Sequence, residues 1–181
     1  MSKEKRDRLF KRGRPVIRPF QVFDGEKYHK DFGIVWVAYK KNPFDSITRW
    51  HDSPIETPDQ LLQIILNIPE GTELLIAEDV NGDVGGFGPV GIVRVHSDGW
   101  AVEPHVEFFP WATARNKLAS TVAFLQMVRY KKIGVCNIYC LDDSVELMDK
   151  ACAYGVLHRV GKIPNGSQLG DLTMYSVRGK K

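Results

Sequence analysis

The sequence predicts an α/β (α+β) fold, with a mixed, mostly antiparallel central sheet of about six to seven strands flanked by about four helices. Residues 73–79, 90–96 and 101–109 are predicted strands joined by short turns, which indicates an antiparallel meander. Residues 101–161 then alternate strand, helix, strand and helix. The 181 residues, 43% of them hydrophobic and 26% charged, suit one domain with a full hydrophobic core.

The positive charge of the chain is concentrated at its N-terminus. Residues 1–18 hold eight basic and two acidic residues, a net charge of +6, whereas the remainder holds 17 basic and 20 acidic residues, a net charge of −3. We therefore predict a basic N-terminal arm (1–15), a single domain (16–178) and a short C-terminal tail (179–181). The arm is either a solvated tail or a segment that docks on nucleic acid or on an acidic protein surface.

The composition also bears on location and metal binding. No apolar run approaches the roughly 20 residues of a membrane helix, and the basic N-terminus lacks the apolar stretch of a secretory signal. We expect a cytosolic protein that does not enter a membrane. The three cysteines, Cys136, Cys140 and Cys152, have no metal-ligand spacing, so no metal site is predicted. Cys136 and Cys140 share one side of a predicted strand and are expected to be small buried hydrophobes.

The first third of the domain contains one predicted strand and two predicted helices. Residues 16–22 form the strand, which Pro19 restricts to a sheet edge or a strand end. The first helix has one apolar face, and Pro43 ends it. The second helix begins with a capping box, Thr57-Pro58-Asp59-Gln60, and Pro69 and Gly71 end it. The residues of the first apolar face are Tyr28, Phe32, Val35 and Tyr39.

A glycine cluster follows the strand at residues 73–79. Asn81-Gly82 is a turn signal, and Gly85, Gly86 and Gly88 come soon after it. Their spacing matches neither the Walker pattern nor the dinucleotide fingerprint, and no capped helix follows. We expect a flexible hairpin loop here.

Three polar side chains alternate along the strand at residues 101–109. Alternation places Glu103, His105 and Glu107 on one face of the strand. Two carboxylates beside a histidine either act as a general base or line the solvated edge of a cleft. Glu107 and Glu103 are the candidate catalytic residues.

The loop at residues 110–113 leads from this strand straight into a helix at residues 114–130. Thr113 is the expected cap, and a helix that begins at a strand end has free N–H groups that suit an anion. Arg115, Asn116 and Lys117 lie in the first turn, where positive charge opposes the helix dipole. We expect these residues beside a bound anion or an acidic partner. Leu118, Val122, Leu125 and Val128 form the expected buried stripe.

The C-terminal third adds a central strand (135–141), a helix (145–154) and two further strands (157–160 and 172–177). Asp142-Asp143-Ser144 is expected to cap the helix, and Gly155 to end it. Residues 163–170 are expected to form a polar turn.

The segment Ser144-Val145-Glu146-Leu147-Met148-Asp149-Lys150-Ala151-Cys152-Ala153-Tyr154-Gly155-Val156 resembles the fourth helix of the GNAT superfamily of N-acetyltransferases, with Val156 in place of the Phe of its terminal Gly-Phe signature. The resemblance extends from about Val16 to Val177. The string Pro104-His105-Val106-Glu107-Phe108-Phe109-Pro110-Trp111-Ala112 also resembles members encoded by tailed bacteriophages. The resemblance implies a GNAT fold and, in an active member, acetyl-CoA as cofactor.

Two features of active members are altered in this chain. Their loop before the third helix has the pattern Arg/Gln-x-x-Gly-x-Gly/Ala, but residues 110–117 contain no glycine, and Pro110 lacks an N–H donor. The tyrosine that often acts as general acid corresponds to Ala151, and Tyr154 lies on another face of that helix. If acetyl-CoA binds, the resemblance assigns its phosphates to Ala112, Thr113, Ala114, Arg115, Asn116 and Lys117.

These observations support two functional hypotheses. In the first, the protein has weak or no catalysis and no cofactor, and is a bacteriophage virion or head/tail assembly component in the host cytoplasm or the virion. Its partners would be other phage structural or ejection proteins, bound through the basic arm, with nucleic acid as a further option. In the second, it is an acetyl-CoA-dependent N-acetyltransferase with a divergent loop.

Overall fold

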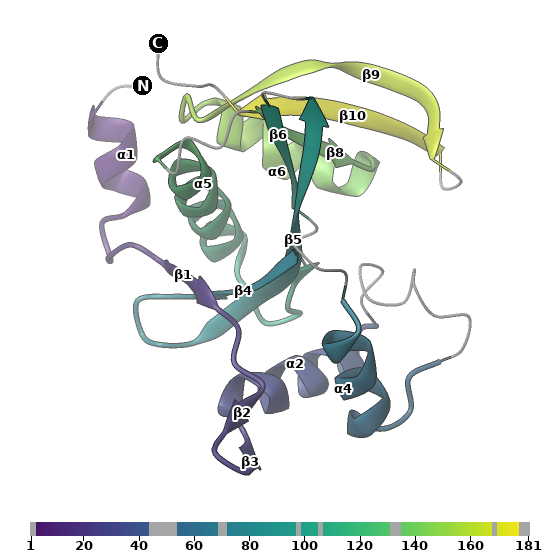
Figure 1. Cartoon of the computed structure of the whole chain (residues 1–181). Helices are drawn as coiled ribbons and strands as arrows, with labels where there is room; N and C mark the ends of the chain where they lie inside the picture. The colour runs from purple at the N-terminus through teal and green to yellow at the C-terminus, as the bar shows by residue number, and fades with distance from the viewer. Residues whose placement is uncertain are drawn as a thin grey trace.

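The computed structural model describes residues 3–43, 54–68, 72–96, 99–104, 107–130, 135–167 and 170–177 (Figure 1). The helices described are α1 (Lys3–Leu9), α2 (Lys30–Lys41), α4 (Pro58–Leu66), α5 (Ala114–Tyr130) and α6 (Asp142–Cys152). The strands described are β1 (Val16–Pro19), β2 (Phe23–Asp24), β3 (Lys27–Tyr28), β4 (Thr72–Glu78), β5 (Val84–His96), β6 (Gly99–Pro104), β7 (Glu107–Phe108), β8 (Val135–Cys140), β9 (Leu157–Ser167) and β10 (Gly170–Val177).

The main sheet has the strand order β1-β4-β5-β6-β8-β10-β9, and β7 pairs with β5 beside this path. Its strand pairs are antiparallel except β6 with β8. β2 and β3 form a separate hairpin. The predicted class, a mixed and mostly antiparallel sheet flanked by helices, is confirmed.

Two clusters of buried side chains lie on the two parts of the sheet. Near the bottom of Figure 1, α2 and α4 pack on β4 and β5 around Phe32, Leu61 and Phe87. The other cluster joins α5 and α6 to β8, β9 and β10 around Leu125 and Tyr175. The segment from β7 to α5 connects the two clusters, because Phe109, just after β7, belongs to the first and Val122, in the middle of α5, to the second.

The glycine cluster was wrongly predicted as a loop, because Gly85, Gly86 and Gly88 lie within β5. Gly86 pairs with Phe108, and a Cβ atom on Gly86 would lie 3.1 Å from Phe108 Cδ1 and 3.2 Å from the Glu107 carbonyl oxygen. Because Gly86 has no side chain, β7 can lie close to β5 at this position. The glycine is therefore explained by close strand packing and not by a need for a flexible loop. The turn itself is confined to residues 79–83, where Gly82 has φ +82°.

The strand predicted at residues 101–109 is two strands, β6 and β7, both paired with β5. β6 is registered with Val90–His96 and β7 with Gly86 and Phe87, so they occupy successive parts of the same neighbour. We expected Glu103, His105 and Glu107 to share one face of a single strand. His105 lies outside the described residues, and Glu103 and Glu107 belong to different strands.

Two boundaries in the C-terminal third were also wrong. α6 begins at Asp142, so Asp142-Asp143-Ser144 form its first turn, and its N-cap residue Leu141 makes no side-chain cap hydrogen bond. β9 runs to Ser167, so most of the expected polar turn is strand. Pairing with β10 explains this extension, since Ile163 is registered with Leu172 and Lys162 Nζ lies 2.8 Å from Asp171 Oδ2.

The N-terminal arm begins with a helix. α1 lies beside α5 in Figure 1, and Leu9 at its end is only 7% exposed within the core cluster of α5. Phe10 packs against the same cluster, and Pro15 is buried. Residues 9–15 are thus attached to the domain, unlike a solvated tail.

The corner between β7 and α5 as a candidate functional site

The chain turns sharply between β7 and α5 at residues 109–113. Phe109 is fully buried, and its backbone N–H donates to the Gly85 carbonyl at 2.9 Å. The Ala112 N–H donates to the Phe109 carbonyl at 2.9 Å and closes a turn over Pro110 and Trp111. Pro110 supplies no donor, and the donor of Ala112 is already used. The corner is therefore a closed turn anchored to β5.

Trp111 fixes the outer side of this corner. Its indole Nε1 donates to the Val84 carbonyl at 2.8 Å, and its ring centroid lies 5.1 Å from that of Phe109. Lys41, the last residue of α2, places Nζ 5.3 Å from the Trp111 ring centroid. Despite these contacts, Trp111 is 41% exposed. Trp111 thus presents an aromatic surface next to a lysine, and does so from a fixed position.

The first turn of α5 is engaged by its own cap and by distant segments. Thr113 caps the helix as predicted, because its Oγ1 accepts from the Asn116 N–H at 3.2 Å. Asn116 Nδ2 donates to Asp79 Oδ2 at 3.1 Å, and Arg115 Nη2 donates to the carbonyls of Arg8 and Leu9 at 3.2 and 3.3 Å. The side chains of three predicted phosphate ligands are therefore occupied within the chain. Of the other three, Ala112 and Lys117 are half-buried and Ala114 is exposed.

A cavity of about 160 Å³ adjoins this turn. One wall comes from the N-terminal segment, one from the β4–β5 turn and one from α5. Arg12 and Arg115 bring positive charge to the cavity, and Asp79 brings negative charge. The lining residues are Leu9, Arg12, Gly13, Pro15, Asp79, Val80, Asn81, Thr113, Arg115, Asn116 and Ala119.

The two candidate catalytic glutamates lie on different strands. Glu107 is half-buried on β7, opposite Phe87. Glu103 lies on β6 opposite Gly91, and its side chain is outside the described part of the structure. On α6, Ala151 is fully buried, and Tyr154 is partly buried against the second core cluster. Glu107 is therefore the candidate base that lies nearest in sequence to the corner, two residues before Phe109.

β6 and β8 are paired over a very short length. Among the described residues their parallel register consists of Ala101 with Val135 and Val102 with Cys136. Beyond these pairs β8 pairs antiparallel with β10, and β7 pairs antiparallel with β5. The sheet therefore separates into two parts just before the corner.

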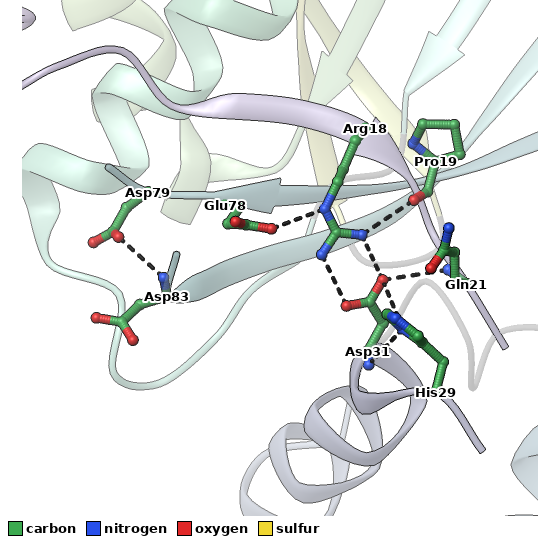
Figure 2. A network of polar contacts seen from close by, with 8 residues as sticks. All are labelled: Arg18, Pro19, Gln21, His29, Asp31, Glu78, Asp79 and Asp83. Carbon is green, nitrogen blue, oxygen red and sulfur yellow. Dashed lines mark hydrogen bonds and ion pairs between the residues drawn. The ribbon is translucent and has the colours of Figure 1, made fainter. Parts of the chain in front are cut away.

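A buried ion-pair network, shown in Figure 2, was not predicted from the sequence. Arg18 on β1 binds both carboxylate oxygens of Asp31 on α2, at 2.5 and 2.9 Å, and its Nε donates to Glu78 Oε2 on β4 at 2.8 Å. His29 caps α2 by accepting from the Asp31 N–H at 3.2 Å. The sequence signals were a basic residue in an edge strand and His-x-Asp at a helix start.

The charges of this network stabilise each other. Burial opposes ionisation of the fully buried Asp31, but the hydrogen bonds and charge of Arg18 outweigh it, so the pKa of Asp31 lies below its ordinary value. The hydrogen bonds from Arg18 to Asp31 likewise raise the pKa of Arg18. Because these groups join β1, β4 and α2 to one another, the network holds these elements together.

No helix among the described residues is both long and apolar enough to cross a lipid bilayer. No cluster of three or more histidine, cysteine, aspartate or glutamate side chains in that part of the chain is arranged to hold a metal ion.

Comparison with known proteins identifies the fold. No protein-family model and no curated protein sequence matches the chain. Among solved structures, spermidine N-acetyltransferase from Vibrio cholerae in complex with CoA and spermine matches with a TM-score of 0.63 at 10% identity, over 91% of this chain and 95% of that chain. A putative phosphinothricin N-acetyltransferase matches with a TM-score of 0.56 at 15% identity, over 92% and 99% of the two chains. The chain therefore has the GNAT acetyltransferase fold.

Proposed function

We propose that this GNAT-fold chain has weak or no catalysis and acts as a bacteriophage virion or head/tail assembly component, in the host cytoplasm or the virion. The observation that carries the proposal is the closed corner between β7 and α5. Pro110 offers no donor, Thr113 caps the helix, and Arg115 is bonded to carbonyls of the N-terminal segment. These contacts reduce the number of donors available to the diphosphate of acetyl-CoA, which is bound through exposed backbone N–H groups, and leave those of Ala114 and Arg115 at the helix start.

The proposed partner is another phage structural or ejection protein with an acidic surface. The N-terminal segment is strongly basic, and Leu9 and Phe10 anchor it to the domain. A surface held in place loses less conformational entropy on binding than a free tail does. The phage context is supported by the sequence resemblance of residues 104–112.

Two measurements test this proposal. Calorimetry with acetyl-CoA is expected to give no binding heat. Tight binding that is abolished by Arg115→Glu would contradict the proposal that the protein has no cofactor. Pull-down against the head, tail and ejection proteins of the phage is expected to capture a partner, and Lys11→Glu/Arg12→Glu/Arg14→Glu is expected to release it. A protein that captures none of them has no assembly role.

A second candidate, an acetyl-CoA-dependent N-acetyltransferase, is favoured by the separation of β6 from β8. This separation opens the sheet next to the corner, and one matched structure of the same fold contains CoA. In this role Glu107 would accept the proton of an amine substrate, and the Ala114 and Arg115 N–H groups, which have no intrahelical acceptor at the helix start, would face the cofactor. An acetylation assay in which Glu107→Gln lowers kcat would support this candidate over the first.

A further inference from the structure

The basic N-terminal segment has a fixed position on the domain. Leu9 is buried against α5, and the Gly13 N–H donates to the Phe10 carbonyl at 2.9 Å to close the turn that follows α1. Arg115 then binds the carbonyls at the end of α1. The Leu9 and Arg115 contacts therefore hold the segment against α5, and the Gly13 hydrogen bond fixes the turn within it.

Gly13 packs closely against Val80 on the β4–β5 turn. Its φ is +110°, a backbone conformation that residues with a side chain rarely adopt. A Cβ atom at this position would lie only 2.5 Å from Val80 Cγ1 and 3.1 Å from Val80 Cβ. Any larger residue must move away from Val80, and the segment would move with it. The docked position therefore depends on a residue that carries no charge.

Docking places the exposed basic side chains of the segment beside α5. Arg12 and Arg115 line the same cavity, although they are far apart in the sequence. Lys11 and Arg14 are exposed next to them, and the Arg14 guanidinium lies 5.7 Å from the Phe10 ring centroid. Arg8 is exposed too, and it pairs with Glu4 at 2.7 Å.

We infer that the docked segment and the first turn of α5 form one composite binding surface for a short acidic polypeptide. The class of partner rests on the proposed function, whereas the composite surface rests on the contacts above. The exposed basic residues of this surface are Lys11, Arg12 and Arg14. Arg115 adds positive charge beside them, because it is exposed and its acceptors, the Arg8 and Leu9 carbonyls, are neutral.

The distribution of negative charge favours a peptide over nucleic acid. Asp79 lines the cavity, and Asp7 and Asp83 are exposed on α1 and on the β4–β5 turn. The chain after residue 18 carries a net charge of −3. A long phosphate backbone would be repelled wherever it left the basic patch, whereas a short acidic segment can stay on the exposed Lys11, Arg12 and Arg14, away from these carboxylates.

The test measures binding of an oligoglutamate peptide to the full chain by fluorescence anisotropy at low salt. Gly13→Ala removes no charge, yet it is expected to weaken binding about tenfold, because the displaced segment must be ordered again in the complex. Val80→Ala added to Gly13→Ala removes the closest clashing atom and is expected to restore part of the affinity. Gly25→Ala is the matched control, since Gly25 also has a positive φ, +62°, but no atom within 4 Å of the added Cβ.

Tryptic cleavage after Lys11 and Arg12 reports whether the segment has undocked, whereas Arg14 precedes Pro15 and is not a tryptic site. If Gly13→Ala leaves it protected, Leu9→Ser replaces a buried anchor and serves as the second undocking variant. An undocked variant that binds the peptide as tightly as the unmodified chain overturns the composite surface and makes the segment a flexible tether. If duplex DNA binds more tightly than the peptide at equal salt, the choice of partner is overturned. If the unmodified chain binds no acidic peptide, the proposed docking function itself fails.

Discussion

Helices α4 and α5 both begin at a threonine, but their first turns are completed in different ways. In α4, Thr57 Oγ1 accepts from the Gln60 N–H at 3.3 Å, and Gln60 Oε1 accepts from the Thr57 N–H at 3.0 Å. In α5, Thr113 caps the Asn116 N–H in the same way. The Asn116 side chain, however, binds Asp79 on a distant turn. The residues of the α4 capping box therefore bond to each other, and only the exposed Asp59 beside them accepts from a distant hydroxyl, that of Tyr28, at 2.9 Å. At the start of α5 the side chains of Arg115 and Asn116 both bond to distant segments.

The difference comes from two side chains in the first turn of α5. Asparagine is one methylene shorter than glutamine, and here its amide reaches outward to Asp79 instead of back to the cap residue. Arg115, the preceding residue, bonds to the end of α1. A helix start that recruits distant segments can locate a binding surface, whereas a capping box completes only the helix itself. Changes at the two starts are therefore expected to have different consequences.

The largest effect is expected at α2, whose start is joined to two strands. Asp31→Ala leaves Arg18 without its bidentate partner, and removing one member of a buried pair is expected to lower the free energy of unfolding by about 3 kcal/mol. Asp59→Ala is the control, because Asp59 is an exposed acidic residue in a first turn whose partner, the Tyr28 hydroxyl, is neutral, and its loss is expected to cost about 1 kcal/mol. Urea unfolding measures both values, and equal losses would contradict a larger contribution from the ion pair between Asp31 and Arg18.

The same pair makes the long-range start sensitive to acid. The pKa of Asp31 is lowered in the folded state, so its contribution to stability is fully present above the ordinary value of 3.8 and is lost as the pH falls through the lower folded value. Arg18 stays charged throughout. The stability difference between the unmodified chain and Asp31→Asn is therefore expected to shrink below about pH 3.8. Urea unfolding at several pH values measures it, and a difference that does not change with pH would show that Asp31 does not titrate as an ion pair.

Several local features of the fold were predicted correctly from the sequence, although the start of α6 was not. The capping box at Thr57 and the bounds of α5 depend on residues within one or two turns of each other. Gly155 adopts φ +69° after α6, as a glycine at a helix end often does. The same holds for the Thr113 cap at the candidate site. Each of these features follows from short-range hydrogen bonds or periodicity.

Features that depend on distant pairing could not be predicted. The role of Gly86 is visible only once β7 lies against β5, and Glu78 is 60 residues from its partner Arg18. At the candidate site, Arg115 was expected beside an anion or an acidic partner, because nothing near it in the sequence indicates that it binds carbonyls 106 and 107 residues away. The sequence thus identifies the corner, and the tertiary structure determines which of its side chains are already occupied.

Removal of the two threonine caps is expected to have a smaller effect. Thr57→Ala and Thr113→Ala each lose one cap hydrogen bond, so each is expected to cost about 1 kcal/mol of unfolding free energy. The two starts differ in their coupling to other segments. A double-mutant cycle between Asn116→Ala and Asp79→Ala is expected to give a measurable interaction energy, whereas a cycle between Asn116→Ala and Gln60→Ala is expected to give none. Additivity in both cycles would show that the contact with Asp79 does not join α5 to the β4–β5 turn.

The smallest effect on global stability is expected for Arg115→Ala. Arg115 is exposed, and its hydrogen bonds to the end of α1 are long, so we expect a change in unfolding free energy of about 0.5 kcal/mol or less. The local effect should nevertheless be clear, because a seven-residue helix is unstable without tertiary contacts. Tryptic cleavage after Lys11 and Arg12 is expected to accelerate in Arg115→Ala but not in Gln60→Ala, which alters the local capping box of α4. Equal cleavage rates in the two variants would mean that Leu9 and Gly13 suffice to hold the segment, and that the first turn of α5 does not act as a junction.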